Sequence, residues 1–390
     1  MKIDDIKHVA VIGAGAMGHS IAQVALMSGY SVSLYDINNK IVENGKLRIE
    51  WSFKRFIEKD KISEGGYKNF MNNLTLTTDL EEAIKKADLC IEAAPEKLDL
   101  KKKIFSDLDK LAPTHAILAS NTSNMSITEI GAVTQRPEKV IGTHFFNPPV
   151  LMPIVEIVKS EKTSKETIKV VTDFIKKSNK IPIFSKDSPG FICNRIIAAS
   201  TLLLNLMLDR KEYPPEKIDA AAMNMGSPIG PYQLQDYLGL DIVYDSMNYL
   251  SERLSKDYAP TSTMEKLLKE NRLGKKTGKG IYNWEKGKPE IDQSDPADFD
   301  MMKPIRVQIN EAVKVLEEGI GTAKDIDTGM KLAFNNLMGP FELAENTDLA
   351  DLTLFLDGLA EKYGKEVFRA HKWIRDGILM EQIAKSEEVR

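Results

Sequence analysis

The feature that most constrains this chain is a glycine-rich turn between a short apolar run and an amphipathic segment. Residues 13–18 are Gly-Ala-Gly-Ala-Met-Gly; they follow the apolar run 9–12 and open a helical pattern over 16–29. In such a context the GxGxxG spacing allows a tight turn, close approach of the backbone to a pyrophosphate, and packing of helix on strand. Single glycines would indicate only turns, whereas the whole pattern predicts a dinucleotide-binding domain. Its expected cofactor contacts are Gly13, Ala14, Gly15, Ala16, Met17 and Gly18.

A carboxylate at the end of the next apolar run narrows the choice of dinucleotide. Asp36 follows the run 32–35 and lies 18 residues after Gly18 (36 − 18 = 18). A carboxylate near this spacing binds the ribose 2′-hydroxyl of NAD. The next residues, Ile37-Asn38-Asn39, include no arginine that could bind the 2′-phosphate of NADP. We therefore predict NAD as the cofactor, although the motif by itself does not identify a substrate.

Short apolar runs alternate with longer amphipathic segments through the first half of the chain. The apolar runs are 9–12, 32–35, 89–91, 116–119 and 140–142, and helical patterns lie at 16–29, 39–60, 97–111 and 126–132. This alternation predicts βαβ crossovers and a mostly parallel sheet covered on both faces. After two further runs, 154–158 and 181–184, the strand pattern stops. The predicted fold class is therefore an α/β Rossmann-type, doubly wound domain followed by an all-α region.

The all-α region contains two segments that resemble each other. Residues 217–220 (Lys-Ile-Asp-Ala) and 229–234 (Ile-Gly-Pro-Tyr-Gln-Leu) recur as 325–328 (Asp-Ile-Asp-Thr) and 338–343 (Met-Gly-Pro-Phe-Glu-Leu). The offsets are 108 (326 − 218) and 109 (339 − 230), so the spacing is shared apart from one inserted residue. Ile-Asp and Gly-Pro pairs are common at helix boundaries, but the shared spacing makes chance a poor explanation. We predict two tandem helical repeats, each stabilised by a partner.

These patterns divide the chain into three domains and a linker. We assign the NAD-binding domain to residues 1–186, the first helical domain to 187–287 and the second helical repeat to 303–390. The linker, 288–302, is rich in Pro and Asp and shows little periodicity. We expect the first helical domain to lie on the substrate side and the second repeat to be structural. The protein is then either a monomer with an internal pseudo-dimer or a homodimer.

The composition excludes several classes of protein. Hydrophobic residues make up 42% of the chain and charged residues 28%, which is typical of a globular protein. The net charge of −4 is too balanced for a protein that binds nucleic acid or an anionic membrane. Two cysteines cannot form a disulfide framework, and no apolar run approaches the roughly 18 residues of a membrane span. Together with an acidic N-terminal sequence, these features favour a cytoplasmic protein.

In an open parallel sheet, ligands bind beyond the carboxyl ends of the strands, so polar residues there are candidates for function. The run 140–142 continues into His144 and an irregular, proline-containing segment, which is a suitable place for a general base. The other histidines lie before a strand, in helices or in a turn, and we interpret them as structural or solvated: His8, His19, His115 and His371. The His and Cys residues lack the spacing of metal ligands, so we expect no metal.

Two further polar residues stand in apolar surroundings. Glu156 is a lone carboxylate inside the run 154–158, where an unpaired charge is costly. If this run were an edge strand, Glu156 could simply face solvent. Otherwise it could hold the imidazole of His144 in one tautomer, as the acid of a catalytic triad does. Asn194 begins a long apolar helical pattern, where it could cap the helix or face solvent.

Six motifs occur in order along the chain. They are 13–18, 120–123 (Ser-Asn-Thr-Ser), 144–148 (His-Phe-Phe-Asn-Pro), 155–157 (Val-Glu-Ile), 187–195 (Asp-Ser-Pro-Gly-Phe-Ile-Cys-Asn-Arg) and 274–282 (Gly-Lys-Lys-Thr-Gly-Lys-Gly-Ile-Tyr). Together they resemble the L-3-hydroxyacyl-CoA dehydrogenase family, which includes 3-hydroxybutyryl-CoA dehydrogenases. The resemblance covers about residues 1–285, and 300–390 resembles a second copy of the family's helical domain. It is specific because its motifs are ordered and distributed over both domains.

The resemblance implies a catalytic set of four residues. His144 would accept the proton of a 3-hydroxyl group as hydride leaves C3 for the nicotinamide, and Glu156 would orient the imidazole. Ser123 and Asn194 would donate hydrogen bonds to the reacting oxygen, and Ser123 would also lie beside the nicotinamide.

The resemblance also implies binding contacts. The family's NAD contacts fall on Ala94, Pro95, Glu96, Lys101, Ser123 and Asn147, and its coenzyme A contacts fall on Ser52 and Lys59. Lys59 could equally belong to the solvated face of the helical segment 39–60. The second repeat has no Asn-Arg pair at the place equivalent to Asn194, near Met302-Lys303-Pro304, so we expect one active site per chain.

The implied function is NAD-dependent oxidation of (S)-3-hydroxyacyl-CoA to 3-oxoacyl-CoA and the reverse reaction, within fatty acid metabolism. Short substrates such as 3-hydroxybutyryl-CoA and acetoacetyl-CoA are favoured. One alternative is another β-hydroxyacid dehydrogenase, acting on a free acid with a lysine base. The other is a non-enzymatic NAD(H)-binding protein. The presence of Ser123, His144, Glu156 and Asn194 together argues against both alternatives.

Overall fold

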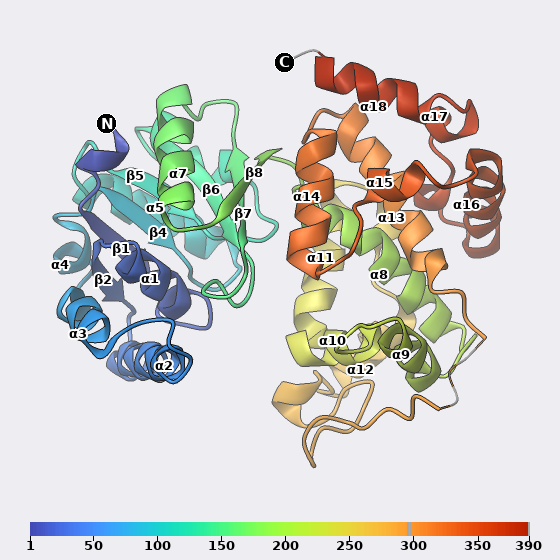
Figure 1. The fold of residues 1–390 in the computed structure, drawn as a ribbon, viewed down its shortest axis with the longest axis horizontal. Coiled ribbons are helices and arrows are strands. Elements are labelled where there is room, and N and C mark those ends of the chain that lie inside the picture. The colour runs from blue at the N-terminus through green and yellow to red at the C-terminus, as the bar shows by residue number, and fades with distance from the viewer. Residues whose placement is uncertain (295, 297, 389–390) are drawn as a thin grey trace. The chain divides into compact units, whose positions relative to one another are not determined.

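The computed structural model describes residues 1–294, 296 and 298–388, and these form two compact units. Unit 1 comprises Met1–Phe191 and Ile320–Leu337, and unit 2 comprises Ile192–Gly319 and Met338–Arg390, apart from the residues outside the description. Unit 1 is built on a sheet and unit 2 is helical (Figure 1). Residues 295 and 297 of the expected linker lie outside the described residues. None of the helices in the described chain has the length and hydropathy of a membrane span.

Unit 1 contains an eight-stranded sheet in the order β3-β2-β1-β4-β5-β6-β7-β8. The strands are β1 His8–Ile12, β2 Ser31–Tyr35, β3 Leu74–Thr77, β4 Leu89–Glu92, β5 Ile117–Ser120, β6 Val140–Phe145, β7 Ile154–Lys159 and β8 Ile181–Lys186. Every neighbouring pair is parallel except β6 and β7, which are antiparallel. The prediction of a mostly parallel, doubly wound sheet is therefore confirmed, and β3 is a strand that the apolar runs did not indicate.

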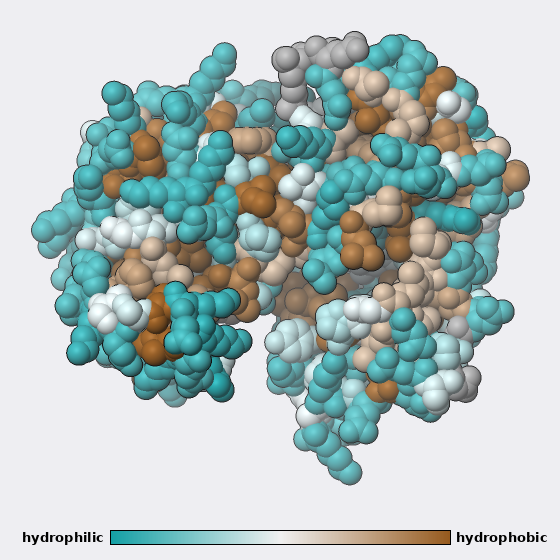
Figure 2. All heavy atoms as spheres, viewed as in Figure 1, coloured by the Kyte–Doolittle hydropathy of each residue, from teal (hydrophilic) through white to brown (hydrophobic). Residues whose placement is uncertain are grey.

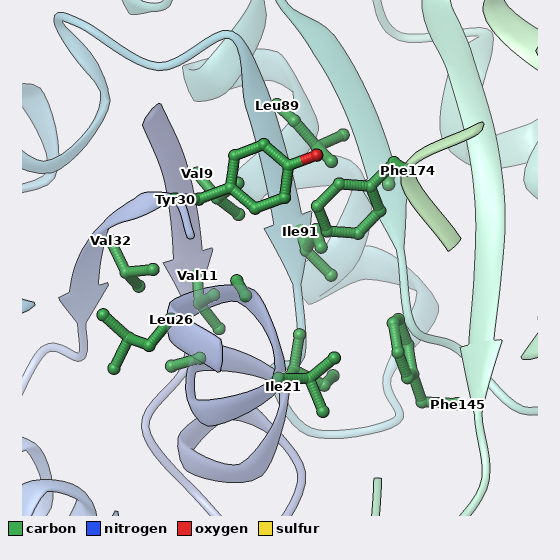
Figure 3. Close-up of a cluster of buried hydrophobic side chains, with 14 of the residues drawn as sticks. Val9, Val11, Ile21, Leu26, Tyr30, Val32, Leu89, Ile91, Phe145 and Phe174 are labelled. Carbon is green, nitrogen blue, oxygen red and sulfur yellow. The ribbon is translucent and has the colours of Figure 1, made fainter. Parts of the chain in front are cut away.

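The sheet of unit 1 has a separate apolar core on each face. Its helices are α1 Gly18–Met27, α2 Asn39–Ile57, α3 Glu64–Asn72, α4 Leu80–Ile84, α5 Leu98–Leu111, α6 Ile127–Gly131, α7 Lys165–Lys177 and α14 Ala323–Phe334. On one face, Ile21 and Leu26 of α1 pack with strand residues such as Val11 and Ile91 (Figure 3). This arrangement brings the amino end of α1 and the carboxyl ends of the parallel strands to one edge of the sheet.

One helix of unit 1 comes from a distant part of the sequence. Helix α14 packs against β7 and β8, and the amide of Lys186 donates a hydrogen bond to the carbonyl of Ile320 (2.8 Å). The segment Ile320–Leu337 therefore groups with the α/β unit, although the sequence pattern assigned it to the second helical repeat, 303–390. Sequence similarity identifies repeated elements, but the surface that each element covers depends on tertiary packing.

Unit 2 consists of helices and connecting turns in its described part, as predicted for the all-α region. The helices are α8 Cys193–Asp209, α9 Pro215–Asn224, α10 Pro231–Leu238, α11 Leu240–Arg253, α12 Ser262–Lys269, α13 Met302–Glu317, α15 Pro340–Ala344, α16 Leu349–Tyr363, α17 Lys372–Arg375 and α18 Leu379–Glu388. The long helices α8 and α13, which begin the two repeats, pack directly on each other (Figure 1).

The lysine- and glycine-rich motif 274–282 folds around a buried carboxylate. Asp236, at the end of α10, accepts hydrogen bonds from the amides of Ile281 and Tyr282, each at 2.8 Å, and from Trp284 Nε1 at 2.9 Å. A Cβ at Gly280 would come within 2.1 Å of Asp236 Oδ1, so only glycine fits there. The packing of unit 2 around Asp236 thus explains the last part of the motif, Gly280 to Tyr282.

Candidate active site

The centre of the candidate site is a buried histidine–glutamate pair. His144 on β6 lies opposite Glu156 on the antiparallel strand β7, and His144 Nδ1 is 2.9 Å from Glu156 Oε2. His144 is 4% exposed and Glu156 is 0% exposed, and β7 lies between β6 and β8. The alternative of a solvent-facing Glu156 on an edge strand is therefore wrong. With Nδ1–H donated to the carboxylate, Nε2 is the imidazole nitrogen that can accept a proton.

Aromatic rings and a backbone hydrogen bond fix the position of His144. The ring centroids of Phe146 and Phe191 lie 4.5 and 6.1 Å from that of His144. Phe191 is buried and adopts a left-handed backbone (φ 52°), a conformation that the surrounding packing must hold. Asn121 Oδ1, at the end of β5, accepts a hydrogen bond from the amide of Phe145 at 2.9 Å. The imidazole is therefore held by its two neighbouring strands and by the segment that follows β8.

A second carboxylate organises the loop that carries Ser123. Glu96 Oε1 accepts hydrogen bonds from the amides of Ser123 (2.8 Å) and Asn124 (3.2 Å), and also from the hydroxyl of Thr122. Glu96 follows β4 and Ser123 follows β5, so the bond joins the ends of two adjacent strands. Glu96 therefore holds the backbone at Ser123 in this structure, in addition to any contact with a cofactor.

The expected NAD contact Lys101 lies in a buried ion-pair cluster. Its Nζ atom is 2.8 Å from Glu92 Oε1 and 3.2 Å from Glu96 Oε2, and the residue is 1% exposed. Glu92 also accepts hydrogen bonds from the amide of Ala94 (2.7 Å) and the hydroxyl of Ser120 (2.6 Å). Burial alone would lower the pKa of Lys101, but Glu92 and Glu96 outweigh that effect and raise it. Lys101 is therefore charged at neutral pH and joins the two carboxylates.

The glycine-rich turn fits a dinucleotide. Gly13 has φ 107°, and a Cβ there would lie 2.7 Å from the carbonyl oxygen of Ala93. A Cβ at Gly18 would lie 1.7 Å from the carbonyl oxygen of Gly13, whereas one at Gly15 would meet no atom within 4 Å. Asp36 Oδ2 accepts a hydrogen bond from the amide of Ala14 at 2.9 Å, which places the carboxylate beside the turn. The tight turn at Gly13, the open space at Gly15 and the nearby carboxylate of Asp36 together match the geometry that binds pyrophosphate and ribose.

The remaining predicted residues are carried by other segments of the chain. Ser52 and Lys59 belong to α2 and the turn after it, where Ser52 is half-buried and Lys59 is exposed. Hydrophilic residues cover much of this helix (Figure 2). Asn147 follows β6, and its peptide bond to Pro148 is cis. Asn194 lies in the first turn of α8, in unit 2.

Sequence reasoning missed Glu92 as a member of the site. Glu92 ends the run Leu-Cys-Ile-Glu of β4 and is 0% exposed, so it is a carboxylate in an apolar strand, as Glu156 is. The same argument that singled out Glu156, the cost of an unpaired buried charge, also applies to Glu92. Asn121 was recognised only as part of a motif, and its hydrogen bond to β6 required the sheet order.

The arrangement combines a proton acceptor, a hydrogen-bonding loop and a dinucleotide turn at the strand ends. These are the parts needed to transfer a hydride and a proton between a bound substrate and a nicotinamide. Within the described residues, no group of three or more His, Cys, Asp or Glu side chains could hold a metal ion.

Comparison with known families identifies both parts of the chain. Residues 8–188 match the family model "3-hydroxyacyl-CoA dehydrogenase, NAD binding domain". Residues 190–284 and 304–388 match "3-hydroxyacyl-CoA dehydrogenase, C-terminal domain". The match to the helical domain therefore lies in two segments of the chain, which fall within the two predicted helical repeats.

Individual relatives agree with this match. A probable 3-hydroxybutyryl-CoA dehydrogenase of Bacillus subtilis is 39% identical over 283 residues, covering 72% of this chain and 98% of that protein. The fatty acid oxidation complex subunit alpha of Vibrio vulnificus is 33% identical over 382 residues, covering 91% of this chain and 53% of that protein. The crystal structure of 3-hydroxybutyryl-CoA dehydrogenase from Escherichia coli has a TM-score of 0.87 and 26% identity, covering 97% of this chain and 99% of that one.

Proposed function

The chain belongs to the 3-hydroxyacyl-CoA dehydrogenase family, and we propose that it interconverts short (S)-3-hydroxyacyl-CoA and 3-oxoacyl-CoA with His144 as the general base. The family establishes an NAD-dependent enzyme of this class. The residue roles and the preference for 3-hydroxybutyryl-CoA and acetoacetyl-CoA are our proposal. The buried His144–Glu156 pair is the observation that carries it.

In the proposed oxidation, the 3-hydroxyl group loses its proton to Nε2 of His144 while C3 loses a hydride. NAD supplies the hydride acceptor when it is bound. Glu156 holds the imidazole through Nδ1 (2.9 Å) and stabilises the imidazolium that forms. Ser123 donates a hydrogen bond to the reacting oxygen, on a loop that Glu96 holds by its backbone. Asn194 is the second proposed donor, and this assignment rests on the family resemblance alone.

The contacts of Lys101 argue against this residue as the base in the alternative that uses a lysine. A base that works near neutral pH needs a lysine whose pKa is lowered. The buried lysine of this site is paired with Glu92 and Glu96, and its pKa is raised instead. The alternative of a non-enzymatic NAD(H)-binding protein gives no reason to maintain a buried imidazole–carboxylate pair at the strand ends. We therefore favour catalysis by His144.

We also propose a cytoplasmic location, an internal pseudo-dimer and binding of coenzyme A at Ser52 and Lys59. Cys90 and Cys193 are buried thiols rather than a disulfide pair, which suits a reducing compartment. The packing of α8 on α13 supports the internal pseudo-dimer. Ser52 lies on α2 and Lys59 in the turn after it, seven residues further along the chain; Ser52 is half-buried and Lys59 is exposed, which leaves both accessible to one extended ligand.

Steady-state oxidation of NADH tests the proposed substrate. The full chain is assayed with acetoacetyl-CoA, with longer 3-oxoacyl-CoA substrates and with free acetoacetate. We expect turnover with the thioesters, highest for acetoacetyl-CoA, and little with the free acid. Equal or greater activity with the free acid would contradict the proposed substrate class.

A further inference from the structure

The two helical repeats meet through a pair of equivalent helices, α8 and α13. The side-chain amide of Gln308 on α13 donates a hydrogen bond to the hydroxyl of Ser200 on α8 at 3.0 Å, in a buried position. The two residues are 108 apart (308 − 200), which is the offset between the repeats. Equivalent residues that contact each other lie on a two-fold axis, so the helices form an internal pseudo-two-fold pair.

Charged residues break this symmetry. Arg195 on α8 donates from Nε to Glu311 (2.8 Å), and from both terminal nitrogens to Glu318 (2.6 and 2.7 Å). Arg195 and Glu311 are each 2% exposed. Burial alone would raise the pKa of Glu311, but Lys314 and Arg195 outweigh it and hold the pKa below its ordinary value. The second repeat thus supplies both carboxylates for a buried arginine of the first repeat.

The symmetry-related positions carry different side chains. Subtracting 108 from 311 and 318 gives Leu203 and Arg210 in the first repeat, and adding 108 to 195 gives Lys303. If two chains paired through α8 alone, Arg195 of one chain would face Leu203 and Arg210 of a second copy. A buried guanidinium without a carboxylate is strongly unfavourable. The charges therefore specify α13, and not a second α8, as the partner of α8.

The arginine lies beside a residue of the proposed site. Asn194 and Arg195 are consecutive in the first turn of α8, and the N-cap residue is Ile192, whose side chain has no hydrogen-bonding atom. First turns of helices are constrained by capping or by packing. Ile192 and Cys193 are 0% exposed, and Arg195 adds three hydrogen bonds to Glu311 of α13 and to Glu318 at its C-terminal end. These bonds therefore help to hold the backbone that carries Asn194.

We propose that Glu311 and Glu318 are positioning residues for Asn194, so that the second repeat contributes to the substrate side of the enzyme as well as to stability. This inference rests on the proposed function, in which Asn194 donates a hydrogen bond to the reacting oxygen. It replaces the expectation that the second repeat is only structural.

The test compares Glu311→Gln and Glu318→Gln with the control Glu317→Gln in the full chain. Glu317 lies on the same helix but pairs with His371 (2.8 Å) and Lys372 (2.6 Å). We expect both test variants to lower kcat with acetoacetyl-CoA by about tenfold and to leave the KM for NADH unchanged, because NADH binds unit 1. The control should keep wild-type kcat. In an Asn194→Ala background, Glu318→Gln should no longer lower kcat, because the effects of two coupled residues are not additive.

Each outcome decides the proposal. If Glu311→Gln and Glu318→Gln fold and keep the wild-type kcat, the proposed positioning role is overturned. It is also overturned if Glu318→Gln lowers kcat in the Asn194→Ala background by as much as in the wild-type background. If Glu311→Gln fails to fold, Glu318→Gln decides alone, because the Glu318 side chain is 48% exposed and its loss is better tolerated. A wild-type enzyme without activity on acetoacetyl-CoA would instead refute the proposed function.

Discussion

Glu156 and Glu92 are two buried carboxylates of the same sheet, and their partners differ. Both are 0% exposed and both stand in apolar strands, β7 and β4. Glu156 faces the imidazole of His144 at 2.9 Å, whereas Glu92 faces the ammonium of Lys101 at 2.8 Å. An imidazole is a common general base, whereas Glu92 and Glu96 raise the pKa of Lys101 and keep it charged at neutral pH.

The comparison shows that a buried carboxylate indicates function only together with its partner. In the proposed mechanism Glu156 assists a proton transfer, because it holds the imidazole that accepts the proton. Glu92 has no such partner. Its contacts with Lys101, Ser120 and Ala94 instead hold the ends of β4 and β5 together. One region is therefore suited to chemistry and the other to maintaining the loops that carry Glu96 and Ser123.

The largest expected effect comes from breaking the first pair. His144→Gln and Glu156→Gln should each lower kcat by about 10²–10⁴-fold, the usual contribution of general acid–base catalysis. NADH binding, measured by fluorescence titration, should remain close to that of the unmodified protein, because the cofactor turn does not involve these residues. Near wild-type turnover in His144→Gln would contradict the mechanism. A collapse of NADH affinity would indicate a folding defect.

Breaking the second pair should affect stability first. Lys101→Met leaves Glu92 and Glu96 without their cation, and loss of one partner of a buried ion pair costs about 3–5 kcal/mol of unfolding free energy. Denaturant unfolding measures this change. The matched control is Lys102→Met. The side chains of Lys102 and its partner Glu129 are 29% and 30% exposed, so losing this ion pair should cost at most about 1 kcal/mol of unfolding free energy. Equal effects of the two variants would refute the scaffold role.

A smaller effect is expected at the cofactor turn. Asp36→Ala removes the carboxylate beside Ala14. It should reduce the preference for NAD over NADP by about 10–100-fold, which corresponds to the free energy of one hydrogen bond to a charged group. The ratio of kcat/KM for the two cofactors measures it. Comparable efficiency with both cofactors in the unmodified enzyme would contradict the prediction of NAD specificity.

The smallest expected effect is a pH dependence of the stability that the ion pairs of Lys101 contribute. Because the folded-state pKa of Lys101 is raised, its ion pairs stabilise the protein fully below the ordinary lysine pKa of about 10.4. This contribution is lost as the pH rises through the raised folded-state value. The difference in unfolding free energy between the native chain and Lys101→Met should stay constant from about pH 7 to pH 10 and then shrink. A difference that grows at alkaline pH would contradict the assignment.

The sequence predicts the part of the site that depends on local pattern. The glycine turn, Asp36 and His144 each follow an apolar run, and strand ends of a parallel sheet meet at one edge. Glu156 stands out because a charge is rare in such a run. Each of these residues could be identified from its immediate neighbours in the sequence.

Features that depend on tertiary packing could not be identified in this way. Lys101 lies in the run 101–103 of three lysines, and nothing local distinguishes it from Lys103, whose side chain is 76% exposed. Its burial depends on how α5 packs at the end of β4. The strand β3 (Leu-Thr-Leu-Thr) lies at the edge of the sheet and is too short and too exposed to form an apolar run. Likewise, α14 is recognisable as a repeat of α9, but its packing on β7 and β8 is not.

We propose that Glu156 acts through the imidazole of His144 and that Glu92 does not. The most direct test introduces Glu156→Gln and Glu92→Gln into the wild-type and the His144→Gln backgrounds and measures kcat for oxidation of (S)-3-hydroxybutyryl-CoA. We expect Glu156→Gln to lower kcat strongly in the wild-type background and to add little in the His144→Gln background, because the effects of residues that act as one unit are not additive. Glu92→Gln should lower kcat by the same factor in both backgrounds. A loss from Glu156→Gln that is the same in both backgrounds, or a loss from Glu92→Gln that also disappears with His144→Gln, would contradict this proposal.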